Sequence, residues 1–380
     1  MVDSRTCDRG AVVPAPLIPD YTGANVRGIV PALLGPARWS ESVPSWFPPG
    51  VSEAEQVVLL VLDGLGWEQL QEHASLMPVL SSLAGSAITT VAPTTTATAL
   101  SSIATGLAPS EHGLLGYRIM LGGDVLNVLR WTVTGVDRRR ALPPSEVQPF
   151  AAFLGHAVPV VSPTELQGSA FTEAHLRGSK PVGWRAASAI AVEVRHALAA
   201  GERFVYAYYG GVDKTAHERG FGEFYEAELR FADRVVASVL EVLPSKAVLL
   251  VTADHGQVQV GDRIVVPDPD LLAMVAVQSG EGRFRWLHAT PGAADDLVKA
   301  ATERYEDVAW VVSREQTIDE HWFGPTFATP LASRLGDVAL VPFAPISFHD
   351  PTDSGPYPLV CRHGSLTPAE VFVPLLAGNA

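Results

Sequence analysis

The chain has 380 residues, 47% hydrophobic and 18% charged, which is enough for one large packed domain or a core with a smaller appendage. The 41 Asp and Glu against 27 Lys and Arg give a formal charge of −14, which argues against broad contact with a nucleic acid polymer. Two cysteines argue against a disulfide framework, and without a signal peptide or a bilayer-spanning apolar run we expect a cytoplasmic protein with no membrane contact.

The first fifty residues are rich in proline and glycine. They predict an irregular N-terminal arm at 1–50 with one short helix near 29–34, ahead of a main domain at 51–380. The first strong element is the continuous apolar run at 56–62, which is typical of a central parallel strand covered on both faces. It ends at Asp63, and we expect a helix from about residue 67.

An apolar, β-branched run at 87–91 predicts a second strand, which leads into the threonine-rich stretch 92–106. Three threonines follow Pro93, and small apolar residues then recur at helical spacing as far as Gly106. Unpaired N–H groups at such a strand-to-helix turn favour an anion, so a hydroxyl held there could attack phosphorus. The alternative is that the threonines only cap the helix, because Thr is a good N-cap residue.

Further strands and helices alternate along the chain. We expect strands near 125–132, 157–161, 203–209 and 247–252, and helices at 144–154, 182–200 and 218–243. This alternation predicts an α/β fold with a doubly wound, mostly parallel central sheet and helices on both faces.

The character of the sequence changes after residue 257. Strands at 283–289 and 308–313 flank a helix at 293–305, which predicts a small α+β insert at about 257–336. We expect 337–341 to return to the main sheet and 368–376 to form a final apolar strand.

Carboxylates and histidines follow several of the predicted strands. Functional residues of α/β sheets gather at the carboxyl ends of the strands, so we expect these side chains to share one site. The candidates are Asp63, Asp213, His217, Asp254, His255 and His363. Asp213 and His217 are four residues apart, which places both on one face of a helix. Each residue alone has an ordinary explanation as a cap or a structural histidine, but together they predict a metal site.

These motifs resemble those of the alkaline phosphatase superfamily, in the branch of type I phosphodiesterases and nucleotide pyrophosphatases. The resemblance extends from about residue 55 to 376 and covers every metal-binding motif of that family. The matching stretches are Leu62-Asp63-Gly64, Pro93-Thr94-Thr95-Thr96, Thr105-Gly106, Glu111-His112-Gly113, Asp213 to His217, Asp254-His255-Gly256 and His363-Gly364.

The resemblance implies a site with two Zn²⁺ ions and a phospho-threonine intermediate. The implied ligands are Asp213, His217 and His363 for one ion, and Asp63, Asp254 and His255 for the other. Thr96 Oγ would be the nucleophile, since it has the family's spacing to Thr105-Gly106, although Thr94 and Thr95 compete for the role. Mixed nitrogen and oxygen ligands suit zinc, but Mn²⁺ or iron remains open because their affinities and geometries overlap.

The chain departs from the family where the nucleotide pyrophosphatases carry an asparagine that donates to the phosphoryl oxygens. Tyr117 stands at that place, and its hydroxyl or the Arg118 guanidinium could bind substrate instead. The alternative is a packed Tyr117 with Arg118 in solvent.

The resemblance implies a hydrolase for a phosphodiester or pyrophosphate bond in a small, nucleotide-type phosphorylated substrate. A phosphomonoesterase on the same site and a catalytically silent binding protein are the alternatives. A sulfatase is disfavoured because neither cysteine lies in a Cys-x-Pro-x-Arg context, and 117–181 is short for the cap of the mutase relatives. The leaving group and the oligomeric state stay open.

Overall fold

A computed structural model describes residues 13–37, 39, 43–353 and 358–379, so the first twelve residues of the predicted arm, with Cys7, lie outside it. The central sheet has seven strands in the order β2-β19-β10-β1-β9-β7-β8. Their bounds are β2 (Ala84–Thr89), β19 (Phe372–Asn379), β10 (Ala247–Thr252), β1 (Gln56–Leu62), β9 (Phe204–Tyr209), β7 (Pro159–Pro163) and β8 (Lys180–Trp184).

The central sheet is mostly parallel, which confirms the predicted fold class. The apolar strand β1 lies in its middle and pairs in parallel with β10 and β9, so both of its faces are buried. Only β19 runs antiparallel to its neighbours β10 and β2.

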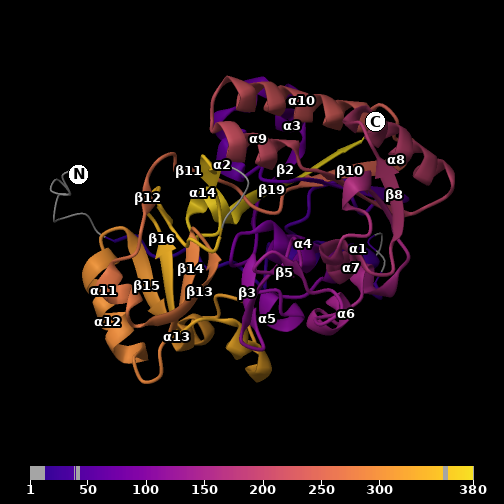
Figure 1. The fold of residues 1–380 in the computed structure, drawn as a ribbon. Helices are drawn as coiled ribbons and strands as arrows, with labels where there is room; N and C mark the ends of the chain where they lie inside the picture. Colours follow the sequence, from indigo (N-terminus) through magenta and orange to yellow (C-terminus); the bar gives the residue numbers. More distant parts are fainter. Residues whose placement is uncertain (1–12, 38, 40–42, 354–357, 380) are drawn as a thin grey trace.

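Helices cover both faces of the central sheet (Figure 1). One layer contains α3 (Pro78–Ser82), α8 (Ile190–Ala199), α9 (Gly211–Arg219) and α10 (Glu223–Leu240). The opposite layer contains α1 (Ile29–Leu34), α4 (Thr96–Thr105) and α7 (Ala170–Leu176). The helix predicted at 29–34 is α1, and the one predicted from residue 67 is α2 (Trp67–Glu72).

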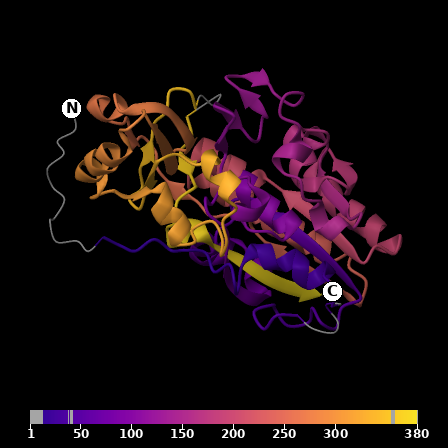
Figure 2. The same cartoon turned by 90° about the horizontal axis from the view of Figure 1, so that it is seen from below.

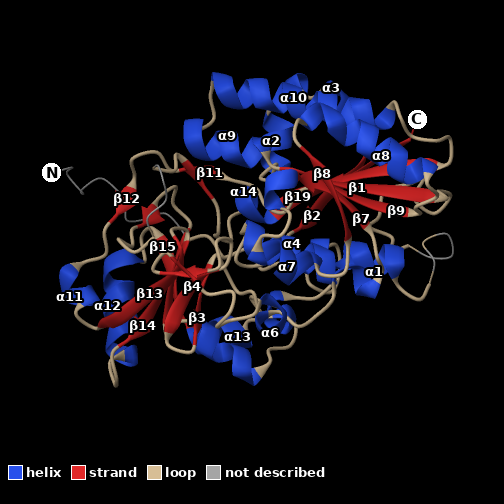
Figure 3. Ribbon diagram, turned by 45° about the vertical axis from the view of Figure 1, so that its right-hand side comes forward, coloured by secondary structure: helices blue, strands red, loops and turns tan. Residues whose placement is uncertain are grey.

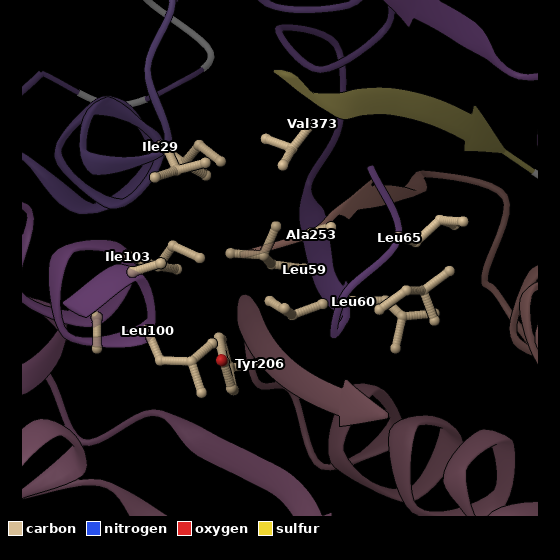
Figure 4. Close-up of a cluster of buried hydrophobic side chains, with 14 of the residues drawn as sticks. Ile29, Leu59, Leu60, Leu65, Leu100, Ile103, Tyr206, Ala253 and Val373 are labelled. Carbon is tan, nitrogen blue, oxygen red and sulfur yellow. The ribbon is translucent and has the colours of Figure 1, made fainter. Parts of the chain in front are cut away.

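The threonine-rich stretch forms the start of α4, which is anchored in the core. Leu100 and Ile103 of this helix lie among the buried side chains that face the central strands, close to Leu59 and Tyr206 (Figure 4). Gly106 ends the helix with φ 73°, a backbone conformation that glycine adopts without strain. The helix is therefore held rigidly, and so is the threonine turn at its N-terminus.

A second, four-stranded antiparallel sheet lies beside the main body (Figures 2 and 3). Its order is β13 (Val275–Glu281), β14 (Phe284–Ala289), β16 (Val338–Pro342) and β15 (Ala309–Ser313), with α11 (Pro269–Leu272) and α12 (Ala294–Tyr305) packed on it. Side chains of β14 alternate: Phe284 and Trp286 belong to the main core, and Leu287 belongs to a separate cluster under α12.

The predicted α+β insert is thus present, but the expected return of 337–341 to the main sheet is wrong. These residues form β16, which pairs with β14 and β15 inside the insert. An apolar run shows that a strand is buried without showing which sheet buries it.

Three expected helices are also corrected by the structure. The helix expected at 144–154 is two short helices, α6 (Pro144–Val147) and η3 (Ala152–Gly155), because Pro149 cannot continue a helix. The first part of 182–200 is strand β8, which pairs with β7, and only the second part is helix α8. The helix expected at 218–243 begins only at Glu223, because Gly220 ends α9 with φ 70°.

A third, small sheet covers part of 117–181. It contains β3 (Arg118–Leu121), β4 (Asp124–Asn127), β5 (Thr132–Val133) and β6 (Val136–Asp137), so the strand expected at 125–132 is two strands joined by a turn. The remaining elements are η1 (Val26–Gly28), η2 (Ala74–Leu76), α5 (Pro109–His112), η4 (Thr164–Leu166), η5 (Ala187–Ala189), β11 (Val258–Gln259), β12 (Ile264–Val265), α13 (Arg314–Asp319), η6 (Thr329–Arg334), β17 (Ser347–Phe348), β18 (Cys361–Arg362) and α14 (Pro368–Val371). No helix in the described ranges has the length and apolarity needed to cross a bilayer.

Candidate active site

The candidate ligands meet at the carboxyl edge of the central strands. Asp63 directly follows β1, Asp213 lies in the first turn of α9 after β9, and Asp254 follows β10 by two residues. Because β9, β1 and β10 are parallel neighbours, their ends bring the three carboxylates together. His363 arrives from a distant part of the chain, directly after β18.

One group of ligand atoms consists of Asp213 Oδ1, His217 Nε2 and His363 Nε2. The α9 turn places His217 Nε2 3.2 Å from Asp213 Oδ1, and His363 Nε2 lies 3.2 Å from His217 Nε2 and 3.8 Å from Asp213 Oδ1. Ligand atoms around a tetrahedral zinc ion, each about 2.1 Å from the metal, are about 3.4 Å apart. The three side chains therefore fit a zinc-sized cation.

A second group forms around His255. Its Nε2 lies 3.3 Å from Asp254 Oδ2 and 3.6 Å from Asp63 Oδ1. Both carboxylate oxygens are buried without a hydrogen-bond partner, an arrangement that is costly unless a cation supplies the missing contact. Asp213 also offers an oxygen within 4.8 Å of ligand atoms of Asp63 and His255, so it lies between the two groups.

The histidines are oriented with Nε2 toward the two groups. Each donates its Nδ1–H to a backbone carbonyl: His217 to Cys361 at 2.7 Å, His363 to Thr94 at 2.8 Å and His255 to Gly256 at 3.0 Å. This tautomer leaves the lone pair on Nε2, as in metal-ligating histidines. The lone pairs of His217 and His363 then face each other, which favours a cation between them.

The electrostatics of the protein alone point the same way. Burial raises the pKa of Asp63, and the negative charges of Asp254 and Asp213 raise it further. Burial also raises the pKa of Asp254, and burial together with the neighbouring imidazoles of His255 and His217 lowers the pKa of His363. Each shift disfavours the charged form, and divalent cations at these atoms would reverse that balance.

The three threonines of the turn have different surroundings. Thr95 is the N-cap residue of α4, but its side chain accepts no capping hydrogen bond, so the capping alternative is not what the structure shows. Thr94 Oγ1 donates to Ser365 O at 2.9 Å and is therefore committed to the loop that carries His363. Thr96 Oγ1 lies 3.1 Å from His255 Nε2, next to the second ligand group.

A cavity of about 250 Å³ opens beside Thr96. Its lining includes Asp63 and Asp213 and is otherwise mostly apolar and aromatic; examples are Leu100, Leu129, Leu166 and Phe171. Leu129 and Leu166 are 36% and 40% exposed, so apolar surface remains uncovered at the cavity. His175 also lines the cavity, and burial lowers its pKa to about 4, which keeps the ring neutral at pH 7.

The two residues considered for substrate binding do not line this cavity. Tyr117 is partly buried, and its hydroxyl accepts a hydrogen bond from Asn127 at 2.6 Å. Arg118 is buried and bonded to Asp350 and Thr352, so the alternative that it lies in solvent does not hold. The Arg118 guanidinium is therefore already paired, and neither side chain reaches the cavity beside Thr96.

Two polar residues at the ligands were not found from the sequence. The Tyr208 hydroxyl donates to Asp63 Oδ2, and Gln257 Nε2 donates to Asp213 Oδ1 at 2.9 Å. Their only signal was position, since Tyr208 lies in the strand before Asp213 and Gln257 lies two residues after His255. Neither residue type indicates a role by itself.

A family model described as type I phosphodiesterase/nucleotide pyrophosphatase matches residues 57–364. No curated protein matches the sequence. The matched range begins in β1 and ends just after His363, so it contains all the residues that form the two ligand groups.

Several solved structures have the same fold. Murine ectonucleotide pyrophosphatase/phosphodiesterase 5 superposes with a TM-score of 0.63 at 13% identity, over 86% of this chain and 88% of that chain. An inactive threonine-to-alanine variant of that protein, in complex with AMP, superposes with a TM-score of 0.62 at 13% identity over the same shares of the two chains. Phosphonoacetate hydrolase from Sinorhizobium meliloti 1021, in complex with phosphonoformate, has a TM-score of 0.61 at 16% identity over 86% and 91%. At these identities the likeness concerns the fold.

Proposed function

We propose that this chain, which belongs to the type I phosphodiesterase/nucleotide pyrophosphatase family of the alkaline phosphatase superfamily, hydrolyses a phosphodiester or pyrophosphate bond through Thr96 at a two-zinc site. Family membership makes the chain a phosphodiesterase-type hydrolase. The observation that carries the covalent mechanism is the Thr96 hydroxyl, 3.1 Å from His255 Nε2 at the edge of the ligand groups. The inactive threonine-to-alanine variant of the murine protein supports a threonine in this role.

In the proposed reaction, Thr96 Oγ attacks phosphorus, the bond to the leaving oxygen breaks, and a phospho-threonine forms that still carries the second organic group of the substrate. Water then cleaves the new ester and restores the hydroxyl, so one water is consumed for each bond broken. The proton lost by Thr96 is balanced by the one that the departing oxygen takes up. Metal ions held by the six candidate ligands would supply Lewis acidity to the attacking and leaving oxygens. The turn between β2 and α4 holds Thr96 in place through the whole cycle, because α4 is packed in the core.

The cavity beside Thr96 favours a diester over a monoester. A diester carries a second organic group, and the cavity of about 250 Å³ provides room for one. No Lys or Arg is among the described residues that line it. A monoester dianion needs more positive charge, but Arg118 is paired with Asp350 and Lys214 is exposed to solvent. A nucleotide-type group fits this setting, and AMP is the ligand bound by the murine relative.

Comparing esters tests the proposal directly. The protein is stripped of metal and reloaded with Zn²⁺, Mn²⁺ or Fe²⁺, and turnover is measured on bis(p-nitrophenyl) phosphate, the p-nitrophenyl ester of thymidine 5′-phosphate and p-nitrophenyl phosphate. We expect the diesters to be hydrolysed faster than the monoester, with Zn²⁺ the most effective ion. Preference for the monoester would establish the phosphomonoesterase alternative. A folded protein that binds no metal and turns over none of the esters would establish the binding-protein alternative.

Acid quenching followed by mass spectrometry tests the covalent step. With a diester substrate we expect the peptide that contains Thr96 to carry a phosphoryl adduct that retains one organic group of the diester in the wild-type protein, and no adduct in the Thr96→Ala variant. An adduct on another residue would refute the assignment of the nucleophile. A cytoplasmic location and a small-molecule substrate are parts of the same proposal, and fractionation of the producing cells checks the location.

A further inference from the structure

The Glu370 carboxylate lies beneath the two loops that carry His255 and His363. Its Oε1 accepts a hydrogen bond from Ser365 N at 3.0 Å, two residues after His363. Its backbone carbonyl accepts from Gly256 N at 3.0 Å, the residue after His255. Glu370 itself is completely buried. One residue of α14 therefore accepts hydrogen bonds from both ligand-bearing loops.

The loop held by Glu370 also determines where the threonine turn lies. Gly364 N donates to Thr94 Oγ1 at 2.9 Å, and Thr94 Oγ1 donates to Ser365 O at 2.9 Å. The His363 imidazole donates Nδ1–H to Thr94 O at 2.8 Å. Thr96 is two residues further along the same turn. A shift of the 364–365 backbone would consequently move both a metal ligand and the nucleophile.

Glu370 is in turn held by Arg283, which comes from the turn between β13 and β14 of the insert. The guanidinium is bidentate, with Nε 2.7 Å from Oε1 and Nη2 2.8 Å from Oε2, and neither side chain is exposed. The remaining donors of Arg283 bond the carbonyls of Pro342, Ala344 and Ile346. The pair is therefore fixed at both ends, by the insert and by the loop after His363.

Both oxygens of the Glu370 carboxylate are fully hydrogen-bonded. Its two oxygens receive four hydrogen bonds, two from Arg283, one from Ser365 N and one from Thr367 Oγ1 at 2.6 Å. A buried ion pair of this kind adds little net stability compared with apolar side chains of similar size, because both charges lose their hydration. Its hydrogen bonds nevertheless impose a single geometry on the groups that they join. Apolar side chains could replace the contribution of this ion pair to stability, but they could not replace the hydrogen bond to Ser365 N.

We propose that Arg283 and Glu370 are positioning residues through which the insert aligns His363 and the threonine turn. This inference rests on the proposed function, because it assigns the pair a role at that same centre. It also assigns a role to the insert, which otherwise packs beside the main sheet without supplying any of the candidate ligands.

The test separates positioning from stability with the double variant Arg283→Met/Glu370→Met. It removes both charges while keeping side-chain volume, and its thermal midpoint measures the stability that the pair contributes. In the metal-free protein we expect faster hydrogen exchange at 94–96 and 363–366, measured by mass spectrometry. Zn²⁺ affinity from chelator competition should fall about 10- to 100-fold, the range typical of lost outer-shell contacts. kcat for bis(p-nitrophenyl) phosphate should fall with it, and KM should change little.

Arg285→Met provides the matched control. Arg285 is as buried as Arg283, lies two residues further along the chain and pairs with Asp350 and Asp353 instead of Glu370. We expect it to lose stability but to keep exchange at 94–96 and the Zn²⁺ affinity of the wild type. Glu370→Gln keeps an acceptor for Ser365 N. Compared with the double variant, it should therefore regain part of the slow exchange at 94–96 and part of the Zn²⁺ affinity.

Unchanged exchange in the folded double variant would overturn the inference. If that variant does not fold, exchange at 94–96 and 363–366 is compared between Glu370→Gln and Arg285→Met in the metal-free protein. Exchange that is no faster in Glu370→Gln than in Arg285→Met would then overturn the inference. A wild-type protein that hydrolyses no ester would refute the proposed function, while the exchange data would still decide on the pair.

Discussion

Replacing Glu281 by Gln tests the energetics of a buried carboxyl next to the site. Glu281 ends β13, is 7% exposed, and accepts a hydrogen bond from Tyr117 N at 2.9 Å through Oε2, while Oε1 has no partner. Burial raises its pKa to about 8, although the Tyr117 N–H and the charge of Arg285 lower it. Gln resembles the protonated acid in shape and keeps an acceptor for Tyr117.

The sign of the effect follows from proton binding. The unfolded chain releases the Glu281 proton near its ordinary pKa of 4.5, whereas the folded protein keeps it until about pH 8. Between these values the folded state holds more protons, so the free energy of unfolding falls by about 1.4 kcal/mol for each pH unit. Stability contributed by the neutral acid is complete below pH 4.5 and is lost as the pH rises toward 8.

The free energy of unfolding of Glu281→Gln, relative to wild type, should therefore increase as the pH rises. From pH 5.5 to pH 8.5, we expect the unfolding free energy of Glu281→Gln relative to wild type to increase by about 3 kcal/mol. Urea unfolding of the metal-free protein at both pH values measures this difference, because metal binding has its own pH dependence. Glu303→Gln, at an exposed position of α12, controls for the loss of one negative charge. If the unfolding free energies of Glu281→Gln and wild type differed by the same amount at both pH values, Glu281 could not be a buried, neutral carboxyl.

Three other perturbations have clear expected outcomes. Thr96→Ala should lower kcat for bis(p-nitrophenyl) phosphate by at least about 1,000-fold without changing Zn²⁺ affinity in chelator competition, and a variant that retains turnover would contradict the covalent mechanism. Removal of metal with EDTA should abolish turnover and lower the thermal midpoint, because Zn²⁺ at about 1,000 times its Kd adds about 4 kcal/mol; an unshifted midpoint in differential scanning fluorimetry would count against a metal centre. Arg118→Met should cost about 1.5–3 kcal/mol in urea unfolding, because it removes the charged hydrogen bond to buried Asp350, which then keeps only Arg285 at 3.5 Å and Thr352 as partners. Arg230→Met, which removes an exposed i,i+4 pair on α10, should cost at most about 0.5 kcal/mol, and equal losses for the two would refute the argument.

The strand-end carboxylates show why much of the site could be predicted from the sequence. Continuous apolar runs in β1, β9 and β10 require parallel strands with both faces covered, and such strands end at one edge of a sheet. Asp63, Asp213 and Asp254 therefore had to come close together. The four-residue spacing of Asp213 and His217 likewise required one helical face, which α9 provides.

The wrong predictions concern segments whose structure depends on distant partners. The stretch 182–200 has helical periodicity, yet its first residues form β8 because β7 offers an open edge. Residues 337–341 are apolar enough for the main sheet but pair with β14 and β15. Pairing partners are tertiary information, and a local pattern does not contain them.

Arg118 shows the same limit within the site region. Its position after the threonine helix made it a candidate for binding the phosphoryl group, but Asp350, 232 residues away, occupies its guanidinium. Arg283 gave no signal in the sequence, although it holds the loop after His363 through Glu370.

The sequence by itself determined the strand and helix alternation, the identity of the six candidate ligands and the threonine turn, because these depend on residue type and on spacing within one element. Only the tertiary structure decided which hydroxyl lies beside His255, what surrounds the cavity, and which charges are already paired. The physical reason is that hydrogen bonds and ion pairs act over a few ångströms in space. The partners of a buried polar group can come from any part of the chain, so their distance along the sequence does not indicate the contact.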